Sequence, residues 1–343
     1  MGTDFASLSY VNETEVLVNG NAKVYGSVFG GGEDGHVRAC LVSDYPEDTI
    51  KPGNTHVTIA ENAVIGDESE QSSAMKGNVY GGGRGLDKDH LGNNSPTAGV
   101  VEGNTKVDIL NGTIWRSVFG GGNESVVKGL RVVNLVDGLV HADVHGGSNA
   151  IPYNNANWAH SGLKTVNIRG GHVMGDVYGC SHSSNDGEVA QSTENAEKWT
   201  SFVNINGGSI DGSVYGAGYA GLVNGSVCVN IGKDAILNAP NKVYNVNYNK
   251  PHTGSWDQTG INPVEPTVST LVIGGSVYGG SDFYGTQTTN DWDDYDLTGY
   301  SLIFIDGKDY NTTDNTGNYM TIGGGLFGSG THTESGQLAS KKD

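Results

Sequence analysis

The sequence has little proline, no Gly-X-Y period and few helical patterns of apolar residues. Proline accounts for 8 of its 343 residues, whereas 55 are glycine. Collagen needs glycine at every third position, and proline-rich disordered chains need proline, so both classes are excluded. Few segments keep apolar residues at helical spacing for long, and Val, Ile, Thr, Tyr and Asn dominate the remainder, which favours a nearly all-β chain.

Cysteine, positive charge and long apolar runs are scarce as well. The three cysteines, Cys40, Cys180 and Cys228, lie far apart and predict no disulfide framework, so we interpret them as small buried apolar residues. Only 19 basic residues stand against 38 acidic ones, and the formal net charge of −19 argues against nucleic acid as a partner. No window of 18 apolar residues occurs, which predicts no membrane insertion, and the first residues show no signal peptide.

One pattern recurs along the whole chain. Its clearest copy, VDILNGTIWRSVFGGG, begins at Val107, and close partners begin at Val166 and Val203. The pattern opens with two apolar residues separated by one other residue, which is the spacing of a half-buried β-strand. This pair occurs as Val16/Val18, Val57/Ile59, Val107/Ile109, Val133/Leu135, Val166/Ile168, Val203/Ile205, Val229/Ile231 and Ile303/Ile305.

A tight corner separates this first strand from the rest of the pattern. Pairs such as Asn111-Gly112 and Gly170-Gly171 supply the positive φ that such a corner needs. We expect the next inward apolar residue five residues after the strand, and one residue later in the first copy. These positions are Val24, Val64, Ile114, Val140, Val173, Ile210, Ile236 and Tyr310.

The most recognisable part of the pattern is V-[YFH]-G, where we predict a second, obligatory corner. Its structural glycines are Gly30, Gly81, Gly120, Gly146, Gly179, Gly216, Gly279 and Gly328. The residues before them are Phe29, Tyr80, Phe119, His145, Tyr178, Tyr215, Tyr278 and Phe327. Aromatic side chains one coil apart can stack on one another, which we favour; the alternative is a solvent-facing strip suited to sugar rings.

The spacing of the copies predicts the fold. Val107 and Val133 lie 26 residues apart, which suits one circuit of a three-sided or flattened coil but not a helix crossover or a propeller blade. We therefore predict a single all-β domain over residues 1–343, a β-solenoid, with a right-handed parallel β-helix of about eight coils as its expected form. Eight layers at ~4.8 Å would make a rod on the order of 35–40 Å long.

Insertions interrupt the pattern, and in solenoids such loops usually carry function. They lie near residues 33–53, 66–77, 84–103, 149–163, 181–199, 238–270 and 282–300. No long amphipathic helix is expected at either end of the array to cover the open strand edges. We expect the chain to be an excerpt of a longer array, or its ends to be covered by loops, and end-to-end association is a further possibility.

The signature G-G-x-[IV]-x-G-x-V-[YF]-G-G-G resembles the repeats of bacterial cell-surface, adhesin-like proteins with β-helix folds. The resemblance covers nearly the whole chain and rests on glycines and small apolar residues, so it carries over no catalytic residue. It implies an extracellular or cell-surface location and a role in adhesion or as a stalk. From the residues alone, the chain is either intracellular or a piece of a longer, processed protein.

Two aspartates are candidate catalytic residues. Asp143 and Asp176 belong to a polar column just before the V-[YFH]-G motif, in successive coils. Their carboxylates could approach within ~5 Å, the separation that a retaining glycosidase uses. The alternative, which we favour, is a solvated polar ladder, because no basic residue lies nearby in sequence to bind an anionic sugar or to shift a pKa.

Two insertions carry candidate binding residues. Tyr244, Tyr248 and Trp256 are candidates for binding a glycan or another surface protein. Asp291, Asp293, Asp294 and Asp296 are close together and offer the oxygen ligands that Ca²⁺ prefers, which makes Ca²⁺ the one candidate cofactor. The segment lacks the glycine and the bidentate acid of an EF-hand, so a solvated acidic loop is the alternative.

These observations favour a non-enzymatic cell-surface scaffold or adhesin-like module that presents loops to a glycan or a protein. Two alternatives stay open. One is a carbohydrate-active β-helix enzyme, either a glycoside hydrolase or a polysaccharide lyase. The other is a purely structural fibre or stalk module.

Overall fold

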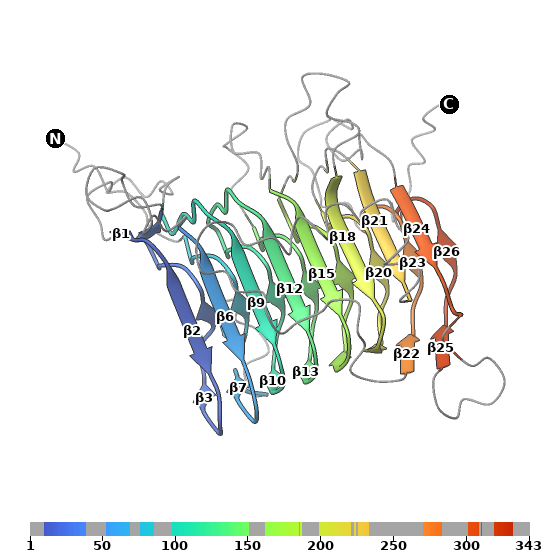
Figure 1. Ribbon diagram of the computed structural model, residues 1–343, viewed down its shortest axis with the longest axis horizontal. Helices are drawn as coiled ribbons and strands as arrows, with labels where there is room; N and C mark the ends of the chain where they lie inside the picture. Colours follow the sequence, from blue (N-terminus) through green and yellow to red (C-terminus); the bar gives the residue numbers. More distant parts are fainter. Residues whose placement is uncertain are drawn as a thin grey trace, which may run out of the picture.

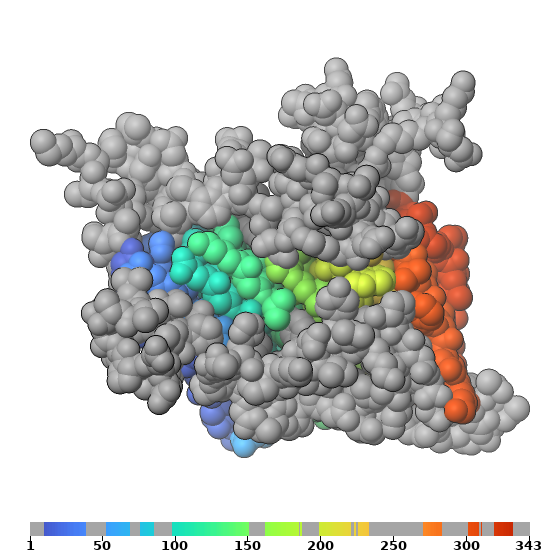
Figure 2. Space-filling model, turned by 45° about the horizontal axis from the view of Figure 1, so that its top comes forward, coloured from blue at the N-terminus to red at the C-terminus, as the bar shows by residue number. Residues whose placement is uncertain are grey.

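The chain forms a parallel β-solenoid. The computed structural model describes residues 10–38, 53–68, 76–85, 98–150, 162–184, 186, 199–220, 223, 226–232, 270–282, 301–308, 310 and 319–331. Within these ranges there is no helix, and three sheets of eight strands each run the length of a rod (Figure 1). The predicted β-solenoid of about eight coils is confirmed. In Figure 2 the successive coils form bands of colour from blue to red across one face.

The first sheet, called sheet 1, holds the predicted V-x-I pairs. Its strands are β2 (Thr14–Val18), β6 (Thr55–Ile59), β9 (Thr105–Ile109), β12 (Arg131–Leu135), β15 (Lys164–Ile168), β18 (Trp199–Ile205), β21 (Ser226–Ile231) and β24 (Ser301–Ile305). Neighbouring strands pair in parallel and in register, so that Val107, Val133 and Val166 stand directly above one another. The repeat of the sequence therefore becomes a column of side chains in the rod.

Sheets 2 and 3 are built from shorter strands, many of only two residues. Sheet 2 holds β3 (Lys23–Val24), β7 (Val64–Ile65), β10 (Thr113–Ile114), β13 (Leu139–Val140), β16 (His172–Val173), β19 (Gly208–Ile210), β22 (Thr270–Ile273) and β25 (Tyr319–Ile322). Sheet 3 holds β4 (Val28–Phe29), β8 (Val79–Tyr80), β11 (Val118–Phe119), β14 (Val144–His145), β17 (Val177–Tyr178), β20 (Val214–Tyr215), β23 (Val277–Tyr278) and β26 (Leu326–Phe327). A small separate sheet pairs β1 (Tyr10–Val11) with β5 (His36–Val37).

Each coil thus has three strands rather than the two that the strand-turn-strand pattern suggests. A two-residue strand contributes one inward side chain and no visible alternation, so its strand character cannot be recognised from periodicity. Its hydrogen bonds come from the coils before and after it, as in the pairing of β10 with both β7 and β13.

The sequence wrongly assigns three residues to the inward column of sheet 2, namely Val64, Ile236 and Tyr310. In the second coil Ile65, not Val64, pairs with Ile114 and is fully buried. In the last coil that position is occupied by Ile322, whereas Tyr310 packs against the core from outside the strand. The constant five-residue spacing fails because the corner between sheets 1 and 2 varies in length.

The seventh coil shows the same effect. Ile273 of β22 pairs with Ile210, so it takes the place that the sequence assigns to Ile236, which lies outside the described residues. The long insertion of this coil therefore precedes β22 instead of following the third apolar position. Every coil has an inward apolar residue in its sheet 2 strand, but the number of residues between it and the preceding sheet 1 strand differs from coil to coil.

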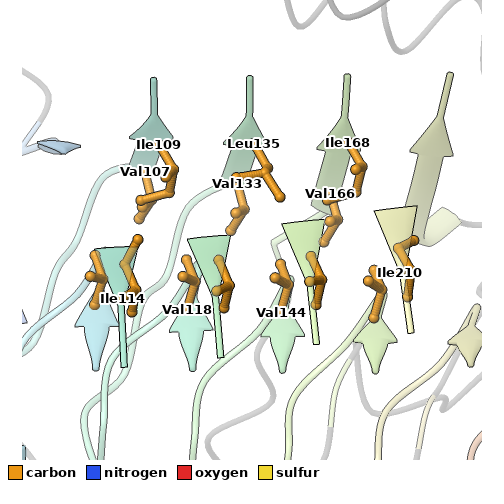
Figure 3. Close-up of a cluster of buried hydrophobic side chains, with 14 of the residues drawn as sticks. Val107, Ile109, Ile114, Val118, Val133, Leu135, Val144, Val166, Ile168 and Ile210 are labelled. Carbon is orange, nitrogen blue, oxygen red and sulfur yellow. The ribbon is translucent and has the colours of Figure 1, made fainter. Parts of the chain in front are cut away.

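The core is a stack of aligned apolar layers. In the third coil the layer consists of Val107, Ile109, Ile114 and Val118, all with no exposed surface. Figure 3 shows side chains from sheet 1 pointing toward those of the facing strands; the labelled residues are Val107, Ile109, Val133, Leu135, Val166, Ile168, Ile114, Val118, Val144 and Ile210. Burying each such side chain stabilises the fold by roughly 1.5–3 kcal/mol before the loss of chain entropy is counted.

Two of the cysteines lie in smaller apolar clusters beside this core. Cys180 packs with Ala217, Val223 and Val227, whereas Cys228 packs with Leu163 and Phe202. Both are free and buried, as the sequence predicts, and Cys40 lies outside the described residues. In the described part of the chain, no helix is long and apolar enough to cross a membrane.

Candidate functional site

The aromatic residues of the V-[YFH]-G motifs form one continuous stack along sheet 3. This aromatic stack consists of Phe29, Tyr80, Phe119, His145, Tyr178, Tyr215, Tyr278 and Phe327. Neighbouring ring centroids lie 4.7 to 4.9 Å apart, with interplanar angles of 3° to 10°. The rings from Tyr80 to Tyr215 are buried. The stack therefore joins coil to coil and is not a solvent-facing strip along those coils.

His145 is the exception in the stack, because it carries polar atoms at a fully buried position. Neither ring nitrogen has a hydrogen-bond partner in the described part of the chain. Its ring is sandwiched between Phe119 and Tyr178, and the edge of His182 lies against it at a centroid distance of 5.5 Å. Burial, helped by the nearby His182, lowers the pKa of His145 well below its usual range, so the ring is neutral at pH 7.

The polar column before the motif is a hydrogen-bonded ladder. Its rungs are Ser27, Asn78, Ser117, Asp143, Asp176, Ser213 and Ser276. Each side-chain oxygen accepts a hydrogen bond from the backbone N–H of the corresponding residue in the next coil, at 2.6 to 3.3 Å. The structure thus places both candidate catalytic aspartates in a ladder where serine and asparagine accept the equivalent backbone hydrogen bonds.

The two aspartates are nonetheless electrostatically distinctive. Asp143 Oδ1 accepts from the Asp176 backbone N–H at 2.8 Å, and Asp176 Oδ1 accepts from Ser213 at 2.6 Å. The Tyr178 hydroxyl lies 3.1 Å from Asp176 Oδ2 and 3.0 Å from Asp282 Oδ2 and donates to one of them at a time. Burial, together with the charges of Asp176 and Asp282, raises the pKa of Asp143 to about 6.

Replacing Asp143 with asparagine is expected to stabilise the protein at pH 7 by about 1–2 kcal/mol. In the folded state the pKa of Asp143 is about 6 instead of 3.8, so stability falls as pH rises through this window. Asparagine keeps the acceptor oxygen, as Asn78 shows on another rung, where its Oδ1 accepts from Ser117 N–H at 3.0 Å. Urea denaturation at several pH values measures the effect.

The gain from Asp143→Asn is expected to vanish below pH 4, roughly where the aspartate is protonated in both folded and unfolded states. Ser117→Asn is the matched control, because it exchanges one neutral rung for another. It should leave the pH dependence of stability unchanged. An equal gain for Asp143→Asn at pH 3.5 and pH 7 would contradict this interpretation, whatever its size at roughly neutral pH.

A second ladder, which the sequence analysis missed, runs over the outer side of sheet 1. Asn134, Asn167, Asn204 and Asn230 each donate from Nδ2 to the side-chain oxygen of the preceding coil, at 2.7 to 2.9 Å, and Asp108 accepts from Asn134 at its start. All five side chains are buried. The signal was available, since asparagine recurs between the two apolar residues of the V-x-I pairs.

Asp108 anchors this ladder with its charge. Its Oδ2 lies 2.7 Å from His56 Nε2 and 2.8 Å from Lys106 Nζ. Burial alone would raise the pKa of Asp108, but the hydrogen bond with His56 and the charge of Lys106 outweigh it and hold the pKa below its usual value. The carboxylate is therefore charged and fully engaged, as expected for a structural ion pair.

Seven of the eight predicted structural glycines, all except Gly328, are required by the close approach of successive coils. A Cβ on Gly146 would lie 2.2 Å from the carbonyl oxygen of Gly179, and one on Gly120 would lie 2.3 Å from that of Gly146. Hydroxyls of sheet 1 complete this corner: Thr105 Oγ1 donates to the Gly120 carbonyl at 2.5 Å. The glycines thus bring each coil into contact with the next.

Partly exposed aromatic and apolar side chains gather at the corner that follows sheet 2. Trp115, His141 and Met174 each come directly after an inward residue of that sheet, in three successive coils, and we call them the Trp115 strip. The Trp115 and His141 rings are stacked at a centroid distance of 3.9 Å, and Met174 is 44% exposed. Both rings are half-buried, so each keeps part of its surface open to solvent.

Polar groups lie beside the Trp115 strip. His172 Nε2 and Asp211 Oδ1 are 2.8 Å apart, and their side chains are 40% and 55% exposed. Arg116 follows Trp115 directly in the chain. Burial and the nearby His172 lower the pKa of His141, whereas Glu68 opposes the shift. The strip therefore offers flat, neutral ring surface with hydrogen-bonding groups at its margin.

Comparison of this chain with protein-family models, curated proteins and solved structures finds no match. The function must therefore be argued from the arrangement of the residues. Among the described residues, no group of three or more His, Cys, Asp or Glu side chains is placed to hold a metal ion.

The candidate residues of the two long insertions cannot be placed. Tyr244, Tyr248 and Trp256 lie outside the described residues, and so do Asp291, Asp293, Asp294 and Asp296. The glycan-binding and Ca²⁺-binding roles of these residues stay predictions. The Trp115 strip was not singled out from the sequence, because Trp115 stands inside the repeat pattern where an outward residue carries no distinctive spacing.

Proposed function

We propose that the protein is a non-enzymatic, adhesin-like scaffold of the cell surface whose rod binds an uncharged glycan at the Trp115 strip. The half-buried Trp115–His141 ring pair is the observation that carries this proposal. Flat aromatic surface packs against the apolar face of a sugar ring, and a few flanking polar groups fix its orientation. The net charge of −19 disfavours anionic glycans.

The rest of the rod supports a structural role. The apolar layers, the aromatic stack and the two ladders all connect one coil to the next, by packing, ring stacking and hydrogen bonds. These regular features therefore stabilise the fold. A rigid rod of this kind holds surface residues in a fixed line, which suits repeated, weak contacts with an extended polymer.

A glycan array probed with the full chain tests the proposal. We expect binding to uncharged glycans, and we expect Trp115→Ala to weaken it by at least about tenfold, because a central aromatic anchor is lost. Leu110→Ala is the matched control: Leu110 is 37% exposed on the same coil but lies outside the strip. An array without binding, or equal binding by Trp115→Ala, would refute the proposal.

The carbohydrate-active enzyme has one observation in its favour, the pKa of about 6 for Asp143 beside Asp176. Against it, the Oδ1 atom of each carboxylate is held by a backbone N–H of the next coil. Hydrolysis of an array-positive glycan that is lost in Asp143→Asn and retained in Ser117→Asn would favour the enzyme over the scaffold.

A further inference from the structure

Large apolar side chains are exposed mainly at the two ends of the rod. We call strands β2, β3 and β4 the N-terminal edge and strands β24, β25 and β26 the C-terminal edge; β2 and β3 stand at one end of the rod, and β24, β25 and β26 at the other (Figure 1). Within the described residues, each of these six strands has a sheet neighbour on one side only. Of the nine exposed large apolar side chains in that part of the chain, seven belong to β1 or to the first or last coil: Tyr10, Val11, Leu17, Tyr25, Phe304, Leu326 and Phe327.

The C-terminal edge has no charge or proline that would block pairing with another strand. Its three strands read SLIFI, YMTI and LF. Leu326 and Phe327 of β26 are 55% and 46% exposed. Natural proteins often protect open edges with lysine, proline or an inward charge, because the free N–H and C=O groups of an edge bind other strands. This edge is therefore suited to pairing with a further coil.

Gly328 points to such a coil as well. In the other seven coils, a Cβ added to the glycine of the V-[YFH]-G motif would lie 2.2 to 2.5 Å from the carbonyl oxygen of the equivalent glycine in the next coil. Nothing lies within 4 Å of a Cβ added to Gly328, and its φ is outside the left-handed region that favours glycine. Glycine at this position is therefore required only if another coil stacks on the C-terminal edge.

The two edges complement one another column by column. Leu17 and Phe304 occupy the column that the asparagine ladder fills in the middle coils, and they are 57% and 36% exposed. Phe29 and Phe327 end the aromatic stack. The inward column of sheet 2 ends in Val24 on one edge and Ile322 on the other. Apolar groups would thus meet apolar groups if one edge were placed on the other.

We propose that copies of this chain stack head to tail, with the N-terminal edge of one copy pairing with the C-terminal edge of the next. Strands β2, β3 and β4 then continue sheets 1, 2 and 3 beyond β24, β25 and β26, in parallel and in the register that the coils of the rod already keep. Leu17 packs on Phe304, and Phe29 stacks on Phe327. The interface is one more copy of the contact between coils, and it does not depend on glycan binding.

Only the head-to-tail arrangement matches all three sheets. In a two-fold dimer of C-terminal edges, the order of the sheets around the rod is reversed in the second copy. If sheet 1 met sheet 1, sheet 2 would then face sheet 3, and the aromatic stack would end at the interface. A head-to-tail contact joins two different surfaces and does not close on itself, so it produces an open row of molecules.

Sedimentation velocity of the full chain at increasing concentration tests the proposal. We expect a monomer in dilute solution and a series of dimers, trimers and longer species as the concentration rises. The net charge of −19 makes copies repel one another, so association should strengthen when the ionic strength is raised to about 0.15 M. A wild-type chain that stays monomeric at every concentration and salt would overturn the proposal.

Two variants block one edge each. Gly328→Ala places a Cβ against the carbonyl oxygen of Gly30 in the next copy, and Leu17→Lys places a charge in the apolar contact with Phe304. Each should weaken association by at least about a hundredfold while unfolding in dilute solution like the wild type. Leu110→Lys is the matched control, because Leu110 is 37% exposed in a middle coil, and it should associate as the wild type does.

Mixing the two variants distinguishes head-to-tail stacking from a two-fold dimer. Gly328→Ala keeps an intact N-terminal edge and Leu17→Lys an intact C-terminal edge, so an equimolar mixture should form a dimer of one copy of each and nothing larger. If Leu17→Lys alone formed dimers, two C-terminal edges would be pairing with one another, and the proposal would be wrong. Association of Gly328→Ala at the wild-type strength would also overturn it.

Discussion

Replacing Gly146 with alanine is expected to lower the free energy of unfolding by at least about 3 kcal/mol. The added Cβ would lie 2.2 Å from the carbonyl oxygen of Gly179 and 3.1 Å from Cβ of Lys164. The first contact is with backbone, which cannot move without separating two coils. The Gly146 N–H also donates to the Tyr178 carbonyl at 2.9 Å, and a displaced coil would lose that bond. Urea denaturation followed by circular dichroism measures the loss.

Gly328→Ala is the matched control for Gly146→Ala. Gly328 occupies the same position in the last coil, but nothing lies within 4 Å of its added Cβ. Its substitution should change stability by less than about 0.5 kcal/mol. Equal effects of the two substitutions would show that the glycine is needed for its backbone conformation and not for the contact between coils.

Replacing His145 with phenylalanine is expected to raise the free energy of unfolding by about 1–2 kcal/mol at pH 7. The substitution removes two buried ring nitrogens that lack hydrogen-bond partners in the described part of the chain. It also extends an arrangement already present, since Phe119 stacks one coil away at a centroid distance of 4.8 Å. The resulting stack would be aromatic and apolar at this level, without a desolvated imidazole.

The difference in the free energy of unfolding between His145→Phe and the wild type should grow as the pH falls. The folded-state pKa of His145 is well below the usual 6.5, so the unfolded chain takes up a proton that the folded chain does not. The contribution of neutral His145 is complete above pH 6.5 and is lost as the pH falls toward the folded-state pKa. The loss amounts to about 1.4 kcal/mol per pH unit, and His145→Phe should remove it.

The reciprocal variant Phe119→His provides the control. Phe119 is 4% exposed in the same stack, so a histidine there should introduce a second acid-sensitive site and steepen the loss of stability below roughly pH 6.5. Asp143 acts in the opposite direction between pH 4 and 6, roughly, because its pKa is raised. Each variant is therefore compared with the wild type at each pH, and parallel curves for His145→Phe and wild type would refute the prediction.

The predictions that held rest on short-range patterns in the chain. The V-x-I pairs identify all eight strands of sheet 1, because a five-residue strand shows its alternation within itself. The aromatic stack followed from the motif, since equivalent residues of stacked coils meet directly. Val64 and Tyr310 were wrong because the two-residue strands of sheet 2 show no alternation and the corner before them varies in length.

For the candidate sites, too, the repeat predicts which residues lie in neighbouring coils, whereas the contacts between them need the structure. Asp143 and Asp176 could be placed in neighbouring coils from the repeat, yet only the structure shows their carboxylates bonded to backbone N–H groups. The amide ladder of Asn134 and its neighbours had a signal in the sequence, but its hydrogen bonds needed coordinates. The proximity of Lys164 to Asp186 had no signal, because Asp186 lies in an insertion whose path the repeat does not describe.

By itself the sequence determined the coil, its number of layers, the apolar columns of sheets 1 and 3, and the glycine and aromatic columns. These depend on local spacing, which repeats in each copy and is satisfied by the adjacent coils. Only the tertiary structure decided which side chains outside those columns meet, such as Trp115 with His141 and Lys164 with Asp186. Those contacts depend on corner lengths and on the course of the insertions, which vary from coil to coil, so no local pattern encodes them.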